Sequence, residues 1–161
     1  MKIAVNKWRN FSGKVLDQPI TTLVEEAIVR EQKAGYRLKI CVGSDSQAYK
    51  AHVAYATVVV ILREGKGGFM FIKNLKGTTK ISTKERMLKE VAMSVQTAYA
   101  ICNILDRYDV ELEVHADINT DPKFESNVAL KEAMGYILGM GFVFKAKPNA
   151  FASSSCADMA V

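Results

Sequence analysis

The chain has 161 residues, of which 49% are hydrophobic and 24% are charged, and its net charge is +5. This length suits one domain with a proper core, and no linker, low-complexity tract or internal repeat divides it. The longest apolar run, Ala54 to Leu62, is too short to cross a membrane, and we find no secretory signal. Three widely spaced cysteines (Cys41, Cys102 and Cys156) indicate reduced thiols in a cytoplasmic protein.

The first 36 residues are predicted to form an arm and a helix that packs on the domain. In residues 21–34 (TTLVEEAIVREQKA) apolar side chains recur at helical spacing, and Gly35 ends the helix. Before it we expect an irregular arm containing Trp8 and Phe11.

Three strands are expected next, over residues 38–44, 53–62 and 68–75. The last two are joined by REGKGG, a glycine-rich turn, which predicts an antiparallel hairpin. The three strands together form an antiparallel meander.

The second half of the sequence alternates helices and strands. The strongest helix runs over residues 82–105, where apolar positions recur every three or four residues. Further elements follow in the order strand, helix, strand and short terminal helix, over residues 109–118, 126–139, 141–146 and 152–161.

This order predicts one α/β domain, residues 1–161, with a mixed five-stranded sheet. The first three strands form the antiparallel meander, the last two are parallel strands joined by right-handed crossovers, and helices cover both faces.

Acidic residues fall where this architecture would bring them together. Asp45 follows the first strand and Asp117 the fourth, and these strands are expected to be parallel neighbours. The long helix carries Glu85 and Glu90, and the terminal helix carries Asp158. Crowded carboxylates repel one another unless a cation neutralises them, and such hard oxygen ligands select Mg²⁺ or Mn²⁺. Two such ions can drive displacement at phosphorus.

Each acid also has an ordinary structural explanation. Asp45 and Asp117 can make turns after strands, and Glu85 completes a capping box with Ser82. The joint arrangement favours a functional site over these separate explanations.

Three segments carry a specific resemblance. VGSDSQ, HADIN and FASSSCAD, with the strand order, resemble the ribonuclease H-like superfamily and, more narrowly, its YkuK-type family. The resemblance implies a metal-dependent nuclease with two Mg²⁺ or Mn²⁺ ions and a nucleic-acid substrate (RNA, DNA or hybrid). By position it implies Asp45, Glu90, Asp117 and Asp158 as catalytic metal ligands, with Glu85 as the rival to Glu90. Unlike the familiar ribonuclease H motif, Ser46 rather than glycine follows Asp45.

Basic residues give the expected nucleic-acid contacts. Between residues 73 and 89 six cations face one acid, which fits either a solvated surface or a phosphate-binding patch. From this run we select Lys84 and Lys89, and we add Lys147 near the metal edge. His115 shares a face with Asp117 and either assists that acid or packs under the N-terminal arm.

Two other functions remain open. A non-catalytic nucleic-acid- or protein-binding module could retain this fold and would bind without metal. An actin-like ATPase shares the sheet order but needs a glycine-rich phosphate loop, which DSQAYK does not provide.

Overall fold

The computed structural model describes residues 7–78, 81–118, 130–139 and 141–161. The elements along the chain are β1 (Trp8–Asn10), β2 (Val15–Leu16), α1 (Ile20–Lys33), β3 (Leu38–Ala48), β4 (Val53–Arg63), β5 (Gly68–Gly77), α2 (Thr83–Arg107), β6 (Glu111–His115), α3 (Leu130–Gly139), β7 (Val143–Lys145), the π-helix η2 (Ala152–Ala157) and α4 (Asp158–Ala160). We call η2 and α4 together the terminal helix. Within the described ranges, no helix combines the length and hydropathy of a membrane-spanning segment.

In the described residues the strands form one sheet in the order β2-β1-β5-β4-β3-β6-β7. The predicted meander is confirmed, because β3 pairs antiparallel with β4, and β4 with β5. The predicted parallel strands are confirmed as well, since β6 pairs with β3 and β7 with β6.

The prediction of five strands was wrong, because the sheet has seven in this part of the chain. The N-terminal arm is not irregular: Trp8 and its neighbours pair with β5, and Val15–Leu16 pairs back on them. Strands of three and two residues are too short to show an alternating pattern in the sequence.

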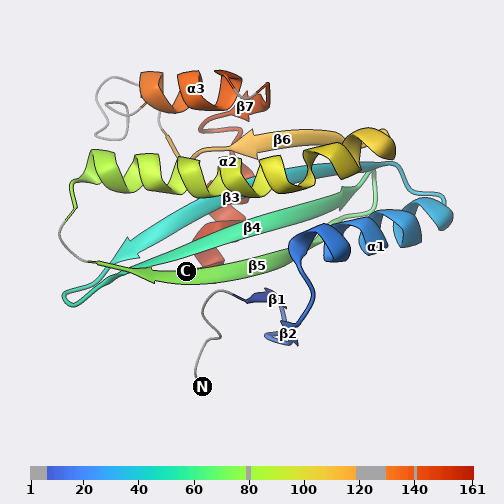
Figure 1. Cartoon of the computed structure of the whole chain (residues 1–161), viewed down its shortest axis with the longest axis horizontal. Helices are drawn as coiled ribbons and strands as arrows, with labels where there is room; N and C mark the ends of the chain where they lie inside the picture. The colour runs from blue at the N-terminus through green and yellow to red at the C-terminus, as the bar shows by residue number, and fades with distance from the viewer. Residues whose placement is uncertain (1–6, 79–80, 119–129, 140) are drawn as a thin grey trace.

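The two faces of the sheet are covered by different helices, as predicted. Ser44 of β3 hydrogen-bonds Ser94 of α2 on one face. On the other face its neighbour Gly43 lies directly against the backbone of Ala152 and Ser153 in the terminal helix. Figure 1 shows α1 and α2 on one side of the sheet and the C-terminus on the other.

The long helix α2 begins where the sequence predicts. The Ser82 side chain accepts a hydrogen bond from the Glu85 amide, which caps the helix. Its apolar stripe, which includes Val91, Val95 and Leu105, is buried with α1 in the larger core. Of the helix expected at 126–139, the described part begins at Leu130, and residues 126–129 lie outside it.

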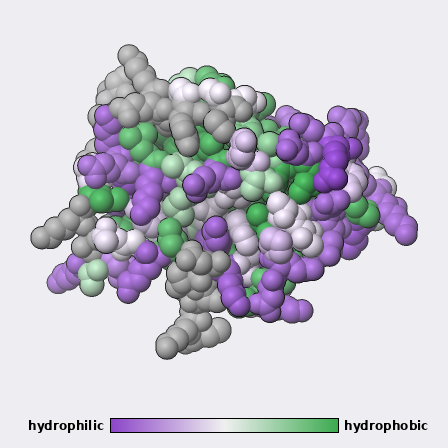
Figure 2. Space-filling view, viewed as in Figure 1, coloured by the Kyte–Doolittle hydropathy of each residue, from purple (hydrophilic) through white to green (hydrophobic). Residues whose placement is uncertain are grey.

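The molecular surface fits the composition. On the face drawn in Figure 2, hydrophilic residues occupy much of the periphery, and hydrophobic ones lie in small groups between them. All three cysteines are free thiols, which agrees with the sequence.

Candidate metal centre at the edge of β3 and β6

The register of β3 and β6 places two acids side by side. Gly43 lies opposite His115 at the last paired position of these parallel strands. Asp45 and Asp117 each follow two residues later, Asp117 just beyond the end of β6, and the charge of Asp117 acts on Asp45. Asp45 does not terminate its strand as expected, because β3 continues to Ala48 by pairing with β4.

The terminal helix brings a third acid to this place. The Asp158 side chain is hydrogen-bonded to that of Asp45, and both Asp158 and Asp117 add negative charge around it. Asp45 is buried, with only 8% of its surface exposed. Burial, above all, raises the pKa of Asp45 to about 7; the backbone amide of Ser46 opposes this, and the two neighbouring acids reinforce it.

The fourth acid comes from α2, on the other side of the sheet. Glu90 is 5% exposed, and its carboxylate accepts a hydrogen bond from the Ser46 hydroxyl. Burial is the largest cause that raises the pKa of Glu90 to about 8, and the charges of Asp45 and Asp117 add to it. Four separated segments therefore converge at one edge of the sheet.

The two rival helix glutamates are distinguished by their surroundings. Glu85 is exposed at the start of α2, where its backbone amide donates a hydrogen bond to the capping Ser82 side chain. Glu90 lies one to two turns further on, where burial, and then the charges of Asp45 and Asp117, raise its pKa. The geometry therefore favours Glu90 as the member of the acidic group.

A lysine already accompanies one of the acids. The Lys147 ammonium lies 2.9 Å from an Asp117 carboxylate oxygen, and it follows β7, the neighbour of β6. Lys147 therefore lies at this edge with a carboxylate as its partner, and its expected contact with nucleic acid stays a prediction.

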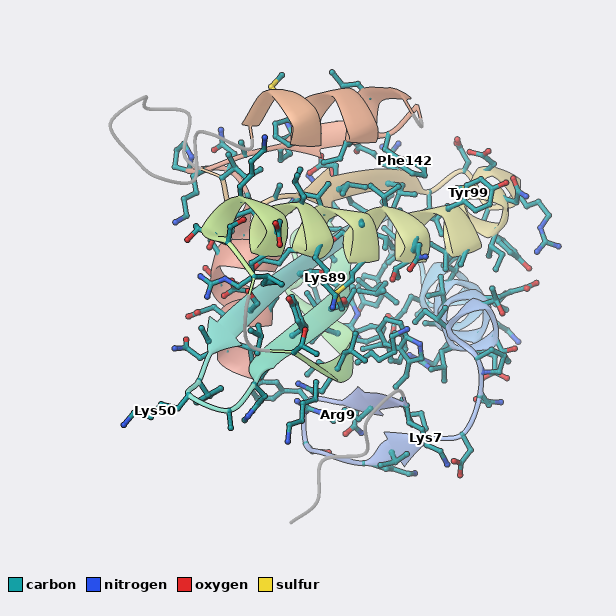
Figure 3. All side chains as sticks on the ribbon, turned by 60° about the vertical axis from the view of Figure 1, so that its left-hand side comes forward. Lys7, Arg9, Lys50, Lys89, Tyr99 and Phe142 are labelled. Carbon is teal, nitrogen blue, oxygen red and sulfur yellow. The ribbon has the colours of Figure 1, made fainter. Side chains whose placement is uncertain are left out.

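The described basic residues between positions 73 and 89 lie on two elements, β5 and α2. The Lys73 ammonium lies over the Trp8 ring on β1, and Lys73 itself is level with Ser44 of β3, two strands across the sheet. Lys89 is on α2, with its ammonium over the Tyr55 ring, where Figure 3 shows it between helix and sheet. Lys84 is exposed near the start of α2, and Lys80 lies outside the described residues.

Arg86 and Tyr55 complete the α2 side of the site. The charge of Arg86 opposes the rise in the pKa of Glu90; burial, above all, raises the pKa of Tyr55, and the charge of Glu90 adds to it. The Tyr55 hydroxyl and the Arg86 Nε are buried without a hydrogen-bond partner in the described part of the chain. This pair of polar atoms was not anticipated from the sequence.

A second group of ligand-type side chains was also missed. Cys41, Glu113 and His115 are buried beside one another behind the acids. Their polar atoms are already engaged: His115 Nε2 lies 3.0 Å from Glu113, and Lys39 lies 3.2 Å from the other oxygen of the same carboxylate. Burial raises the pKa of the Cys41 thiol to about 12. The group is therefore a closed hydrogen-bond network rather than a prepared metal site.

His115 was expected to be satisfied by the N-terminal arm, but the described part of that arm pairs with β5 instead. The Nδ1 atom of His115 accepts a hydrogen bond from the Ala152 amide, and its ring meets the Phe151 ring edge-on at 4.9 Å. The alternation of Glu113, His115 and Asp117 along the strand was the available signal. The sequence did not indicate that the terminal helix would be the partner.

Comparison with known proteins agrees with this architecture. A family model described as "Ribonuclease H-like" matches residues 20–160. The chain is 28% identical, over 158 residues and 88% of each chain, to "Uncharacterized protein YkuK" of Bacillus subtilis (strain 168). Because the matched region contains the whole sheet except β1 and β2, the chain belongs to the ribonuclease H-like family.

Proposed function

We propose that this protein is a metal-dependent nuclease that hydrolyses nucleic-acid phosphodiesters with two Mg²⁺ or Mn²⁺ ions. The observation that supports this is the convergence of Asp45, Glu90, Asp117 and Asp158 from four segments of the chain. Family membership adds to it, although that membership alone names no substrate.

The donor set fits hard divalent cations. All four groups are carboxylates, the ligands that Mg²⁺ and Mn²⁺ prefer. Burial, above all, raises the pKa values of Asp45 and Glu90, and the charges of the neighbouring carboxylates add to it. A divalent cation beside them would offset this repulsion, and Asp45, whose charge interacts with those of Glu90, Asp117 and Asp158, is the natural shared ligand.

Bound ions would supply Lewis-acid stabilisation of charge at phosphorus and an activated water. The protein's own residues would hold and orient the substrate. Lys89 and Lys84 on α2 carry positive charge to the side of Glu90, where a phosphate backbone would be attracted. When the metal binds, the Lys147 ammonium would leave Asp117 and contact a substrate phosphate instead.

Matched glutamine and asparagine variants test the proposal. We expect Asp45→Asn and Glu90→Gln each to reduce Mn²⁺ affinity and to lower hydrolysis of RNA, DNA or hybrid by at least about 100-fold. Glu85→Gln is the control, because it removes the same charge from the same helix at an exposed site. Full Mn²⁺ affinity in Asp45→Asn would contradict the assignment.

The contact of Lys147 with Asp117 supports one alternative, a non-catalytic binding module that retains the fold. In that case the ammonium permanently takes the place of a metal ion. Nucleic-acid binding would then depend on salt but not on Mn²⁺, and no variant of the four acids would change it.

A further inference from the structure

Asp158 lies close to the end of the chain, three residues before Val161, and its side chain is exposed. Apart from its bond to Asp45, the side chain is placed by the backbone of the terminal helix, so the anchors of that helix decide whether this acid reaches the site.

The first anchor is at the start of the terminal helix. The Ala152 amide donates to His115 Nδ1 at 3.1 Å, and both residues are fully buried. Because Nδ1 accepts, the ring proton is on Nε2, which donates to Glu113. Lys39 holds that carboxylate in turn. Contacts within β3 and β6 thus fix the orientation of the His115 ring independently of the terminal helix.

The second anchor is at the other end, two residues after Asp158. The Asn74 side-chain amide on β5 donates to the Ala160 carbonyl at 2.9 Å. The Asn74 carbonyl oxygen accepts from Arg9 Nε at 3.1 Å, and Figure 3 shows Arg9 on the N-terminal strand β1. This contact gives the added strand β1 a role at the site.

Between these ends the helix lies directly on the sheet. Gly43 has no side chain, and a Cβ there would lie 2.5 Å from the Ser153 nitrogen. Ala152 and Ala157 pack with Val58 and Ile72 in a small apolar cluster. Two polar anchors and one close contact therefore fix a segment of nine residues.

We propose that His115 and Asn74 are positioning residues that hold the terminal helix at its two ends and so keep Asp158 against Asp45. This inference rests on the proposed metal-dependent function. It also gives the N-terminal arm a part in that function, through Arg9 and Asn74.

Two variants of His115 test its two hydrogen bonds separately: the one that Nδ1 accepts from Ala152 and the one that Nε2 donates to Glu113. In His115→Asn the amide oxygen can occupy the position of Nδ1 and accept from Ala152, whereas His115→Gln reaches only the position of Nε2. We expect His115→Gln to speed amide hydrogen exchange in residues 152–160 by roughly 10-fold, with α2 unchanged. Its Mn²⁺ affinity should fall by about 10-fold, as for residues that orient ligands. His115→Asn keeps the acceptor for Ala152 but loses the donor to Glu113, so it should lie closer than His115→Gln to the unmodified protein in both measurements.

Asn74→Asp tests the second end, since it keeps the acceptor for Arg9 and loses the donor to Ala160. We expect faster exchange near residue 160 and weaker Mn²⁺ binding, while Arg9→Gln gives a smaller loss of the same kind. Unchanged exchange in Asn74→Asp would remove this residue from the proposal.

A double variant distinguishes positioning from general destabilisation. In an Asp158→Asn background, adding His115→Gln should leave Mn²⁺ affinity unchanged, because its effect passes through Asp158. A further fall in affinity, or equal exchange rates in His115→Gln and His115→Asn, would overturn the proposal. If the unmodified protein bound no Mn²⁺, the proposed function would fail, and the exchange rates alone would decide whether the anchors exist.

Discussion

The Ser46 hydroxyl donates to the Glu90 carboxylate, although the neighbouring residue in β3, Asp45, projects from the opposite face of the sheet. Two adjacent residues of β3 thus contact acids on both sides of the sheet. Ser46 hydrogen-bonds Glu90, and Asp45 lies with Asp158 and Asp117. Because the sheet separates the two covering helices, this pair of residues connects Glu90 on the α2 side with the aspartates on the other side.

Removing this hydroxyl should make Glu90 harder to ionise. The bond from Ser46 lowers the pKa of Glu90, so Ser46→Ala should raise that pKa above its present value of about 8. Since metal binding requires the carboxylate, the pH at which Mn²⁺ binding is half-maximal should move upward. Mn²⁺ titrations between about pH 6 and 9 measure this.

Ser44→Ala is the matched control for that variant. Ser44 is on the same face of the same strand, but its hydroxyl bonds Thr57 and Ser94 rather than an acid. It should cost stability, about 1 kcal/mol, without moving the pH dependence of Mn²⁺ binding. An equal shift in both variants would contradict the role given to Ser46.

The metal-free protein should lose stability as pH rises from about 4 to 8. The pKa values of Asp45 and Glu90 are raised in the folded state, to about 7 and about 8, so the folded state binds more protons than the unfolded chain in this range. Excess proton binding by the folded state means that the free energy of unfolding falls with pH there. Urea unfolding at several pH values measures the slope.

Asp45→Asn should flatten this slope, and Mn²⁺ should reverse it, because ions bind the ionised folded state. The exposed Glu85→Gln should leave the slope as it is. A metal-free protein whose stability rises steadily over this range would contradict the placement of these two acids.

Lys147→Met should increase Mn²⁺ affinity several-fold. The ammonium 2.9 Å from Asp117 competes with a divalent cation for the same carboxylate, and methionine keeps the chain length without the charge. Isothermal titration with Mn²⁺ measures the change, and Lys145→Met, on β7, is the control. A loss of affinity in Lys147→Met would show that the lysine supports the metal site.

The parts of the fold predicted from the sequence are those with long, regular patterns. The meander, its parallel neighbours and α2 carry their alternation or helical spacing over many residues, so β3 to β5 and α2 could be placed to within a few residues. Glu90 could be preferred over Glu85 because small residues follow it (Ser94, Thr97 and Ala98), which let the helix lie close to the sheet.

The contacts that were missed join distant segments. Arg9, Asn74 and Ala160 belong to the arm, β5 and the terminal helix, and no periodic pattern relates such residues. The strand β1 likewise forms because it pairs with the edge of β5, and its own short sequence does not predict a strand.

Gly43→Ala should displace the terminal helix from the sheet. The added methyl group would meet the Ser153 nitrogen and the Ala152 carbonyl carbon, which are backbone atoms that cannot rotate away. We expect a loss of about 1–3 kcal/mol and weaker Mn²⁺ binding through Asp158. Thermal unfolding with and without Mn²⁺ measures both effects. Gly139→Ala, where a Cβ would meet nothing within 4 Å, should cost nothing.

The most direct test is a crystal soaked in Mn²⁺, with the ions located by anomalous scattering. The account predicts two ions among Asp45, Glu90, Asp117 and Asp158, with Asp45 touching both and Lys147 moved away from Asp117. Carboxylates without Mn²⁺ at saturating concentration, with Lys147 still on Asp117, would contradict the metal centre.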